Sequence, residues 1–467
     1  MELMLFNSLG QKVEIFKPLE TKTVRIYSCG PTVYERAHIG NLASFIYADT
    51  LRRTLSAAGY KVKHVMNITD VDDKTIAASR KAFPDDSPME ALKKLTAKYE
   101  KLFLKDLGAV GVDVKALQFV RATDSIELMQ ALIRKLVTAG VAYIADDGIY
   151  FSISIYKTAG KTYGQLVKVS ADSTKESRID NDDYDKDNAH DFALWKTQKS
   201  GEPAWDFEIE GQSIKGRPGW HIECSAMSVH ELGQPFDIHT GGVDLKFPHH
   251  ENEIAQSTAV GDNLLAKLFL HSEHLLVDDQ KMSKSLNNFY TLDDVRAHGF
   301  EPLTFRLFVL QSHYRSQAHF SWQNLEHAAN RLKHWRQVAA KWRQMPDTEW
   351  AQSFQVNAGT SDIWHELSED LDTPTALEKA DSEFDRIDSL GAQAESIEAW
   401  TNLLGQIETL FGLDILEKDP TIDKLVAKRE TARKKGDWEL ADDIRQRLEE
   451  QGIGINDTDS GPVWYRL

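Results

Sequence analysis

Four residues of this 467-residue chain carry side chains that bind Zn²⁺ well: Cys29, Cys224, His249 and Glu253. Two thiolates, an imidazole and a carboxylate together form a ligand set typical of zinc. His249 and Glu253 are four positions apart, so on a helix they share one face. His250 is also a candidate by residue type, although it lies three positions from Glu253. The alternative is that both cysteines are buried structural thiols, which is common for this residue.

A second set of polar residues lies where a predicted strand turns into a predicted helix. The stretch is VRIYSCGPTVYERAHIGN, residues 24–41, with an alternating strand pattern at its start and a Gly-Pro turn in its middle. His38, Gly40 and Asn41 then open an apolar-periodic segment, residues 42–58, that is typical of a helix. A helix N-terminus presents unpaired N–H groups and a positive dipole end. We therefore expect a phosphate group to bind here.

The pentapeptide KMSKS, residues 281–285, follows a strand-like segment at residues 267–277. Lys281 and Lys284 flank Ser283, and two lysines in a loop after a strand suit a clamp for a polyphosphate. Taken singly, each of these residues is equally typical of a solvent-exposed loop.

The elements that would position these groups predict a parallel α/β sheet. Residues 61–70 have a second strand pattern, which makes a β-α-β unit with the helix at 42–58. Residues 236–239 form a further short strand, and we expect a turn at Thr240-Gly241-Gly242. Ligands of such sheets bind at the carboxyl ends of the strands. The two cysteines and the phosphate-binding residues should therefore meet at that edge.

Composition is that of an ordinary globular protein with an acidic balance. The hydrophobic content is 41% and the formal net charge is −17. This charge argues against nucleic-acid binding by the bulk field, although basic residues cluster locally at 327–343 and 424–435. No apolar run approaches the roughly 18 residues of a membrane span, and the start of the chain lacks the features of a signal peptide. We therefore expect a cytoplasmic protein with reduced thiols and no membrane association.

The pairing of HIGN with KMSKS resembles the signatures of class I aminoacyl-tRNA synthetases. That resemblance implies ATP as a substrate, accompanied by Mg²⁺. It also implies that His38 and Lys284 stabilise charge while the amino-acid carboxylate attacks the α-phosphate, with Lys281 on the phosphates. The family motif often ends in His, where this chain has Asn41, which keeps an amide but carries no charge. The residues that the resemblance puts at ATP are His38, Gly40, Asn41, Lys281, Ser283 and Lys284.

Four longer motifs make the resemblance narrower: CGPTVY at 29–34, NITDVDDK at 67–74, GRPGWHIECSAM at 216–227 and FPHHENEIAQS at 247–257. Together they are similar to the cysteinyl-tRNA synthetase family, nearly from end to end. In that family zinc binds the thiol of the substrate L-cysteine, and its ligands match Cys29, Cys224, His249 and Glu253. Residues matching Thr69, Trp220 and His239 surround the bound cysteine, although Trp220 and His239 are equally ordinary as core residues. Thr240 departs from the family's usual triple glycine after this histidine.

The C-terminal residues 432–464 resemble the family's anticodon-binding end, which implies tRNA(Cys) as a partner. The positions that match its anticodon contacts are Arg433, Asp442 and Asp457, with Trp438 and Trp464 nearby. RNA recognition of this kind uses unstacked bases, aromatic surfaces and hydrogen bonds to base edges. Taken singly, each of these residues also fits an amphipathic helix with exposed charges and a packed tryptophan.

The resemblance implies an α/β fold in which a Rossmann-like catalytic domain, split by an insertion, precedes an α-helical bundle and a small anticodon-binding module. We expect the catalytic domain at residues 1–88 and 210–291, with the connective insertion at 89–209. The later parts are stem-contact helices at 292–345, the bundle at 346–420 and the anticodon module at 421–467. Members of the family are usually monomeric, so a monomer is expected.

The implied reaction is that of a cysteine–tRNA ligase with one zinc ion per chain. L-cysteine would be activated by ATP to cysteinyl-adenylate and transferred to the 3′ end of tRNA(Cys). One alternative is a cysteine-activating ligase with a small amino-sugar acceptor, which would not need an anticodon end. Another is a non-catalytic paralogue that binds zinc or RNA. The intact His38, Lys281, Lys284 and metal-ligand set argue against it.

Overall fold

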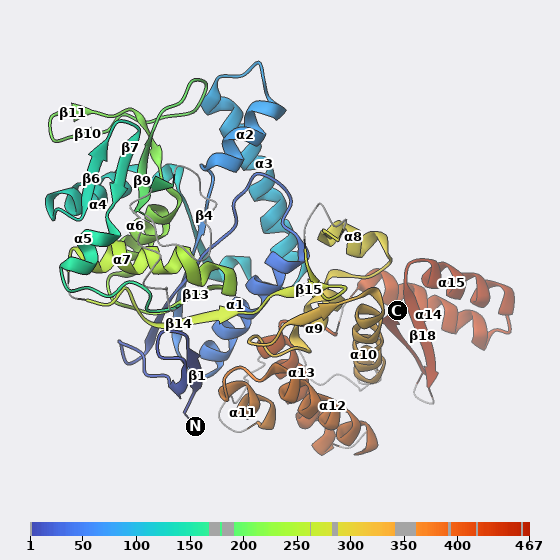
Figure 1. Ribbon diagram of the computed structural model, residues 1–467. Helices are drawn as coiled ribbons and strands as arrows, with labels where there is room; N and C mark the ends of the chain where they lie inside the picture. Colours follow the sequence, from blue (N-terminus) through green and yellow to red (C-terminus); the bar gives the residue numbers. More distant parts are fainter. Residues whose placement is uncertain are drawn as a thin grey trace.

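A five-stranded parallel sheet, with strand order β14-β13-β3-β4-β5, organises the N-terminal part of the chain (Figure 1). The computed structural model describes residues 2–167, 178–179, 191–261, 263–282, 288–340, 361–390, 394–416, 419–458 and 461–467. The strands of this sheet are β3 (Thr23–Ser28), β4 (Lys61–Ile68), β5 (Leu117–Arg121), β13 (Phe236–Gly242) and β14 (Ala266–Ser272). Each neighbouring pair runs in parallel. The expected parallel α/β sheet is confirmed.

Helix α1 (Ile39–Ala57) connects β3 to β4 and completes the expected β-α-β unit. Its apolar residues Ile39, Leu42 and Ile46 are fully buried. His38 caps the N-terminus, because its ring accepts the backbone N–H of Asn41, while the Asn41 side chain accepts the N–H of His38. This capping box fixes the first turn of the helix beside the end of β3.

Further helices connect and cover the strands. They are α2 (Asp73–Ala82), α3 (Pro88–Ala109), α6 (Trp220–Leu232) and α7 (Glu251–Ala259). Strand β5 comes from the stretch 89–209 that we expected to be an insertion, yet it pairs with β4. The main sheet therefore continues past residue 88. Hydrogen bonding to the edge of β4, which a linear reading of the sequence cannot detect, brings β5 into it.

A second sheet, also of five strands, has the order β12-β9-β7-β6 and is antiparallel along this path. Its strands are β6 (Ala142–Ala145), β7 (Gly148–Phe151), β9 (Asp191–Thr197) and β12 (Gly216–Pro218), and β8 (Arg178–Ile179) pairs with β9. Helices α4 (Ile126–Thr138) and α5 (Ile153–Thr158), together with the short strands β10 (Glu208–Ile209) and β11 (Gln212–Ser213), belong to the same region of the chain (Figure 1). This sheet leads directly into α6, so it helps to hold that helix against the main sheet.

Two local expectations were wrong. Thr240-Gly241-Gly242 is not a turn, because β13 continues to Gly242 and pairs Thr240 with both Ser28 and Leu270. The segment 267–277 is not one strand either. It divides into β14 and β15 (Leu275–Val277), and β15 belongs to a separate sheet with β16 (Gln280–Lys281) and β17 (Ala318–Phe320).

The later part of the chain is mainly helical. Its elements are α8 (Leu292–Ala297), α9 (Pro302–Leu310), α10 (Trp322–Ala340), α11 (Asp362–Ser368), α12 (Thr373–Leu390), α13 (Ala394–Phe411), α14 (Pro420–Lys434), α15 (Trp438–Glu450), β18 (Ile453–Thr458) and β19 (Gly461–Arg466). The last four pack around a small core of their own, drawn in red on the right of Figure 1. At the other end of the chain, β1 (Met4–Asn7) and β2 (Lys12–Ile15) form a hairpin. Among the described residues, no helix has the length and apolar character needed to cross a membrane.

A buried ion cluster joins α1 to the later helices. Asp49 on α1 accepts hydrogen bonds from Arg52, Arg53 and Arg306. Burial opposes ionisation of Asp49, but the three guanidinium groups outweigh it and hold the pKa of the carboxyl below its usual range. Arg306 also donates to the carbonyl oxygens of Phe411 and Val110. The cluster therefore links α1, α9, α13 and the end of α3.

Replacing Asp49 by alanine is expected to destabilise the protein by about 3–5 kcal/mol, because it leaves Arg306 buried without its counter-ion. Since the carboxyl pKa is lowered, the contribution of Asp49 holds above its unfolded pKa of about 3.9 and fades only at lower pH. Urea unfolding followed by near-UV circular dichroism would measure the change. The matched control is Glu383→Ala, which breaks the exposed pair with Arg386 and should cost about 0–1 kcal/mol. Equal losses in the two variants would contradict the prediction.

Candidate active site and metal cluster

The four zinc-type side chains meet at the carboxyl end of the main sheet. Cys29 directly follows β3, Cys224 lies on α6, His249 lies just before α7, and Glu253 is on α7. All four are buried, and Cys29 is the most accessible at 8%. Three separate segments of the chain are needed to assemble the set. These contacts depend on the sheet bringing β3 and α6 side by side.

Four of the six separations between the ligand atoms lie close to the edges of a zinc tetrahedron. Bond lengths of about 2.3 Å to sulfur and 2.0–2.1 Å to nitrogen or oxygen require edges of about 3.8 Å (S–S), 3.5 Å (S–N or S–O) and 3.3 Å (N–O). The two Sγ atoms lie 3.8 Å apart, and His249 Nε2 lies 3.4 Å from Cys224 Sγ. Glu253 Oε1 lies 3.7 Å from Cys29 Sγ and 3.2 Å from His249 Nε2. The residues present therefore fit the ion.

The electrostatics of the cluster also favour a cation. Burial raises the pKa of both thiols, and the neighbouring Glu253 carboxylate raises them further. Burial lowers the pKa of His249 to about 3, although Glu253 opposes this shift, so the imidazole is neutral and has a lone pair to donate. A bound divalent cation reverses the effect on the thiols, because it stabilises thiolate directly.

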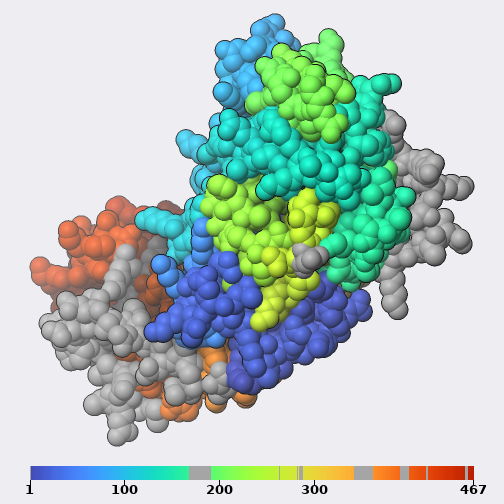
Figure 2. Space-filling model, turned by 90° about the vertical axis from the view of Figure 1, so that its left-hand side faces the viewer, coloured from blue at the N-terminus to red at the C-terminus, as the bar shows by residue number. Residues whose placement is uncertain are grey.

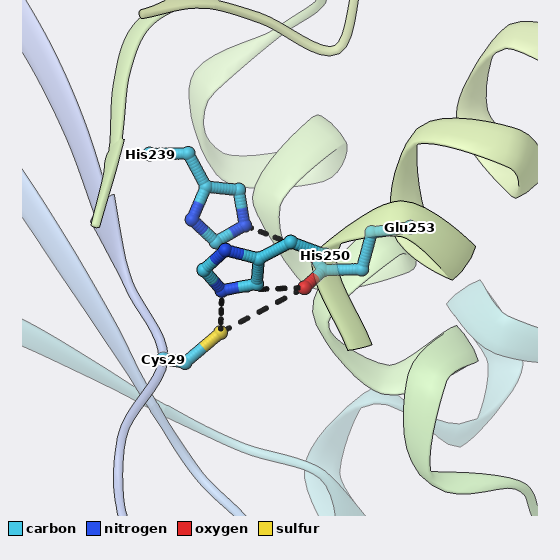
Figure 3. Close-up of side chains that lie close together, drawn as sticks. All are labelled: Cys29, His239, His250 and Glu253. Atoms are coloured by element: carbon cyan, nitrogen blue, oxygen red, sulfur yellow. Dashed lines mark hydrogen bonds and ion pairs between the residues drawn. The ribbon is translucent and has the colours of Figure 1, made fainter. Parts of the chain in front are cut away.

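A second set of four side chains shares two members with the first. It combines Cys29 and Glu253 with His239 and His250 (Figure 3). His239 Nε2 lies 2.9 Å from Glu253 Oε2, the length of a direct hydrogen bond, while His250 Nε2 lies 4.0 Å from Glu253 Oε1. One separation is too short for a zinc tetrahedron and the other too long. The geometry therefore favours the set with Cys224 and His249.

A cavity of about 340 Å³ opens beside Cys29 and extends to the N-terminus of α1. Residues that line it include Cys29, Gly30, Tyr34, His38, Asn41, Trp220, Gly241, Gly242, Asp244 and Phe289. His38 Nδ1 accepts the N–H of Asn41, and burial lowers the pKa of His38 to about 4. The ring is therefore neutral near pH 7 with its proton on Nε2, which can donate to a phosphate oxygen.

Three glycines near this cavity have neighbours too close for a side chain. A Cβ at Gly30 would overlap the carbonyl of Asn67, and one at Gly40 would overlap Met282 and the ring of His38. A Cβ at Gly241 would lie 2.9 Å from His250 Cε1. The backbone thus approaches closely at the turn after β3 and along the end of β13, where only glycine fits.

The KMSKS residues Ser283 and Lys284 lie outside the described residues, and for Lys281 only the backbone, in β16, is described. Met282 of the pentapeptide and Phe289, which follows it, nevertheless reach the HIGN turn. Met282 lies against Gly40, and the ring of Phe289 lies 5.1 Å from that of His38.

The three residues expected around the substrate cysteine differ in their contacts with the metal cluster. Trp220 lines the cavity and stacks on the His249 ring at 4.2 Å. His239 contacts Glu253, as described above, and Thr69 donates to Glu223 at 3.1 Å. Thr69 and His239 are almost completely buried at 1% and 0%. Trp220 and His239 therefore contact members of the metal cluster, whereas Thr69 contacts Glu223, the residue before Cys224 on α6.

The expected anticodon residues lie together in the C-terminal part. Arg433 pairs with Asp457 at 2.7 Å, and Asp457 also pairs with Arg429. Asp442 is exposed on α15, and Trp438, at the start of that helix, is 60% exposed. Trp464 is buried and donates to Asp423, so it packs the core of this part.

Sequence reasoning missed several residues of the site. Glu223, Asp244 and Phe289 line or support the cavity, but single polar or aromatic residues give no signal in the sequence. His271 and Ser8 contact each other and reach His250. The sequence contained one hint of these contacts. The pair His249-His250 has two imidazoles, whereas the metal set needs one, so the second must have other neighbours.

Comparison with known proteins agrees with the fold. Residues 15–330 match the family "tRNA synthetases class I (C) catalytic domain". The structure resembles a methionyl-tRNA synthetase of Mycobacterium tuberculosis with methionyl-adenylate (TM-score 0.55, 13% identity, 84% of this chain and 90% of that one). It also resembles the Agrobacterium radiobacter agnB2 LeuRS in a ternary complex (TM-score 0.57, 11% identity, 85% and 84% covered). Fold and site together define a class I aminoacyl-tRNA synthetase.

Further matches identify the family within this class of synthetases. Residues 417–464 match the family "Cysteinyl-tRNA ligase anticodon binding domain". The chain is 39% identical to a cysteine–tRNA ligase of Koribacter versatilis over 513 aligned positions, covering 100% of both proteins. It is also 39% identical to one of Leptospira interrogans, covering 100% of this chain and 99% of that protein. The chain belongs to the cysteine–tRNA ligase family. Relatives of this length, with an anticodon domain, do not favour the amino-sugar alternative.

Proposed function

We propose that this chain charges tRNA: ATP + L-cysteine + tRNA(Cys) → cysteinyl-tRNA(Cys) + AMP + PPi. The observation that carries the proposal is the cluster of Cys29, Cys224, His249 and Glu253, whose member Cys29 lines the cavity that also contains His38. The full-length relatives supply the substrate class. Mg²⁺ accompanies ATP, and the protein acts as a cytoplasmic monomer.

The four clustered residues hold one zinc ion in this proposal. When bound, zinc supplies a soft Lewis acid that takes a thiolate far more readily than a hydroxyl. Serine differs from cysteine only by oxygen in place of sulfur, and an apolar pocket would reject it by only about 1–3 kcal/mol. Two thiolates and one carboxylate around the ion also make the site poorly suited to activating water. Thr69, Trp220 and His239 orient the amino acid beside the cluster.

The residues of the two signature segments bind ATP. His38 donates from Nε2 to a phosphate oxygen, since its Nδ1 is occupied by the Asn41 N–H. Gly40 lets the phosphate approach the backbone, and Asn41 keeps the helix start in place through the capping box. Lys281, Ser283 and Lys284 bind the phosphates, and Lys284 together with His38 stabilises the charge that develops at the α-phosphorus.

The C-terminal part recognises the anticodon through Arg433, Asp442 and Asp457 in this proposal. Arg433 and Asp457 hold each other in position, which orients their remaining hydrogen-bonding groups. The exposed ring of Trp438 provides a surface on which an unstacked base can lie.

Replacing Trp438 by alanine should raise KM for tRNA by about 5- to 150-fold, since loss of one stacked base costs about 1–3 kcal/mol. Aminoacylation kinetics with a tRNA(Cys) transcript would measure this. Cysteine-dependent ATP–pyrophosphate exchange without tRNA should not change, because Trp438 lies far along the chain from the cavity residues. A normal KM for tRNA would remove Trp438 from the interface.

The direct test of the proposed function is charging of a tRNA(Cys) transcript with labelled cysteine by zinc-loaded protein. Charging should require ATP and should not occur with serine. Cysteine-dependent pyrophosphate exchange without charging would instead indicate a small-molecule acceptor. Absence of both activities would indicate a binding protein and overturn the proposal.

A further inference from the structure

A continuous chain of hydrogen bonds leads from Cys29 through two buried histidines to Ser8. His250 Nε2 lies 3.3 Å from Cys29 Sγ, His250 Nδ1 lies 2.8 Å from His271 Nε2, and His271 Nδ1 lies 2.8 Å from Ser8 Oγ. The exposed fractions of His250, His271 and Ser8 are 0%, 4% and 3%. Figure 3 shows the His250 ring with a dashed contact to the sulfur.

Four separate segments supply this chain. Cys29 follows β3, His250 precedes α7, His271 lies on β14, and Ser8 follows β1. The backbone N–H of Ser8 donates to the carbonyl of Phe269 at 2.8 Å, which fixes the N-terminal hairpin against β14. In Figure 2 the dark-blue N-terminal residues lie directly against the yellow-green part of the chain. The N-terminal segment thus reaches the surroundings of the metal cluster.

The direction of these hydrogen bonds is determined once Cys29 is a thiolate. His250 Nδ1 and His271 Nε2 share one hydrogen bond, so one of these nitrogens carries the proton and the other the lone pair, and His271 Nδ1 shares another with the Ser8 hydroxyl. A thiolate at Cys29 can only accept, so His250 must carry its proton on Nε2. His250 Nδ1 then accepts from His271 Nε2–H, and His271 Nδ1 accepts the Ser8 hydroxyl. Every donor along the chain finds an acceptor.

If His250 were itself a metal ligand, the same chain would have to run the other way. Its Nε2 would need a lone pair, its Nδ1–H would donate to His271, and His271 would donate to Ser8. The distance of 4.0 Å from His250 Nε2 to Glu253 Oε1 does not suit that arrangement. The two adjacent histidines therefore have different partners: His249 points at the metal position and His250 points at Cys29 Sγ.

We propose that Ser8, His271 and His250 form a positioning chain that fixes the Cys29 thiolate and tunes its bond to the metal. The proposal rests on the proposed function, because it requires a metal held by Cys29. A hydrogen bond to a coordinated thiolate orients the sulfur and reduces the charge that it donates. None of the three residues needs to touch the substrate.

The test replaces Zn²⁺ by Co²⁺, whose sulfur-to-metal charge-transfer absorption reports on the thiolates. His271→Leu removes the donor to His250, while His271→Gln keeps an N–H group at the same place. His271→Leu should weaken metal binding by about 10–100-fold in chelator competition and shift the charge-transfer band to lower energy. His271→Gln should restore both towards the wild type. Ser8→Ala, a smaller change, should shift the band in the same direction by less.

A second pair of variants separates a ligand from a positioning residue. His250→Gln keeps an N–H donor towards Cys29 and should retain Co²⁺, whereas His249→Gln should lose it. Equal loss of metal in these two variants would make His250 a ligand and overturn the proposal. Wild-type affinity and absorption in His271→Leu would overturn it as well. A wild-type protein that binds no metal would instead overturn the proposed metal site, which tRNA charging by the wild type tests separately.

Discussion

Replacing Cys224 by alanine is expected to remove zinc from the protein and to abolish cysteine activation with it. The wild type should contain about one zinc per chain by atomic absorption, as a four-ligand site implies, and the variant only a small fraction of that. Cysteine-dependent ATP–pyrophosphate exchange should fall by more than the 10–100-fold typical of losing an outer-sphere partner. The physical reason is that the remaining ligands no longer close a tetrahedron, and the buried thiol of Cys29 returns to its raised pKa.

The matched control for this variant is Ser228→Ala. Ser228 lies one turn further along α6, is equally buried, and donates only to the backbone carbonyl of Ser225. Its replacement should leave the zinc content and the exchange rate unchanged. If the Cys224 variant kept both its zinc and its exchange activity, the metal-based account of cysteine selection would be wrong. If it lost zinc but still activated cysteine fully, zinc would have a structural role only.

Replacing His38 by asparagine is expected to lower adenylate formation by about 10²–10³-fold, the size typical of removing one preorganised donor from a transition state. Asparagine can still accept the N–H of Asn41, so the N-cap of α1 is kept and the protein should retain its melting temperature. Alanine at this position would lose the cap too, at a cost of about 1 kcal/mol. The zinc content of both variants should equal that of the wild type.

Single-turnover formation of the adenylate would separate this effect from slow product release. Because burial lowers the pKa of His38 to about 4, the ring is neutral at neutral pH and becomes protonated only in clearly acidic solution. The rate for the wild type should therefore show no inflection from His38 between about pH 6 and 8. An unchanged rate in the asparagine variant would exclude His38 from the reaction.

The sequence determined the class of site because the relevant signals are local. The alternating strand, the Gly-Pro turn and the start of α1 follow one another within residues 24–41, so their order in space follows from their order in the chain. Likewise, the spacing of His249 and Glu253 places both on one face of a helix. Such arguments hold without knowledge of any distant contact.

Only the tertiary structure decided how distant segments meet. Strand β5 joined the main sheet by pairing with β4, and Thr240 became part of β13 by pairing with Ser28 and Leu270. Both depend on backbone hydrogen bonds between segments far apart in the sequence, which composition does not encode. The buried cluster around Asp49 depends on such contacts too, since Arg306 is 257 positions away.

The two adjacent histidines show most clearly what the sequence determined and what the fold decided. The sequence determined that an imidazole belongs to the zinc-type set, because residue type and helical spacing are local properties. Residue type alone left His250 open as well, and the spacing of four positions to Glu253 favoured His249. The fold decided by placing His249 Nε2 3.2 Å from Glu253 Oε1 and His250 against Cys29, His271 and, through His271, Ser8. The reason is geometric: the neighbours that orient each ring, Cys224 for His249 and Cys29 with His271 for His250, come from segments distant in the sequence.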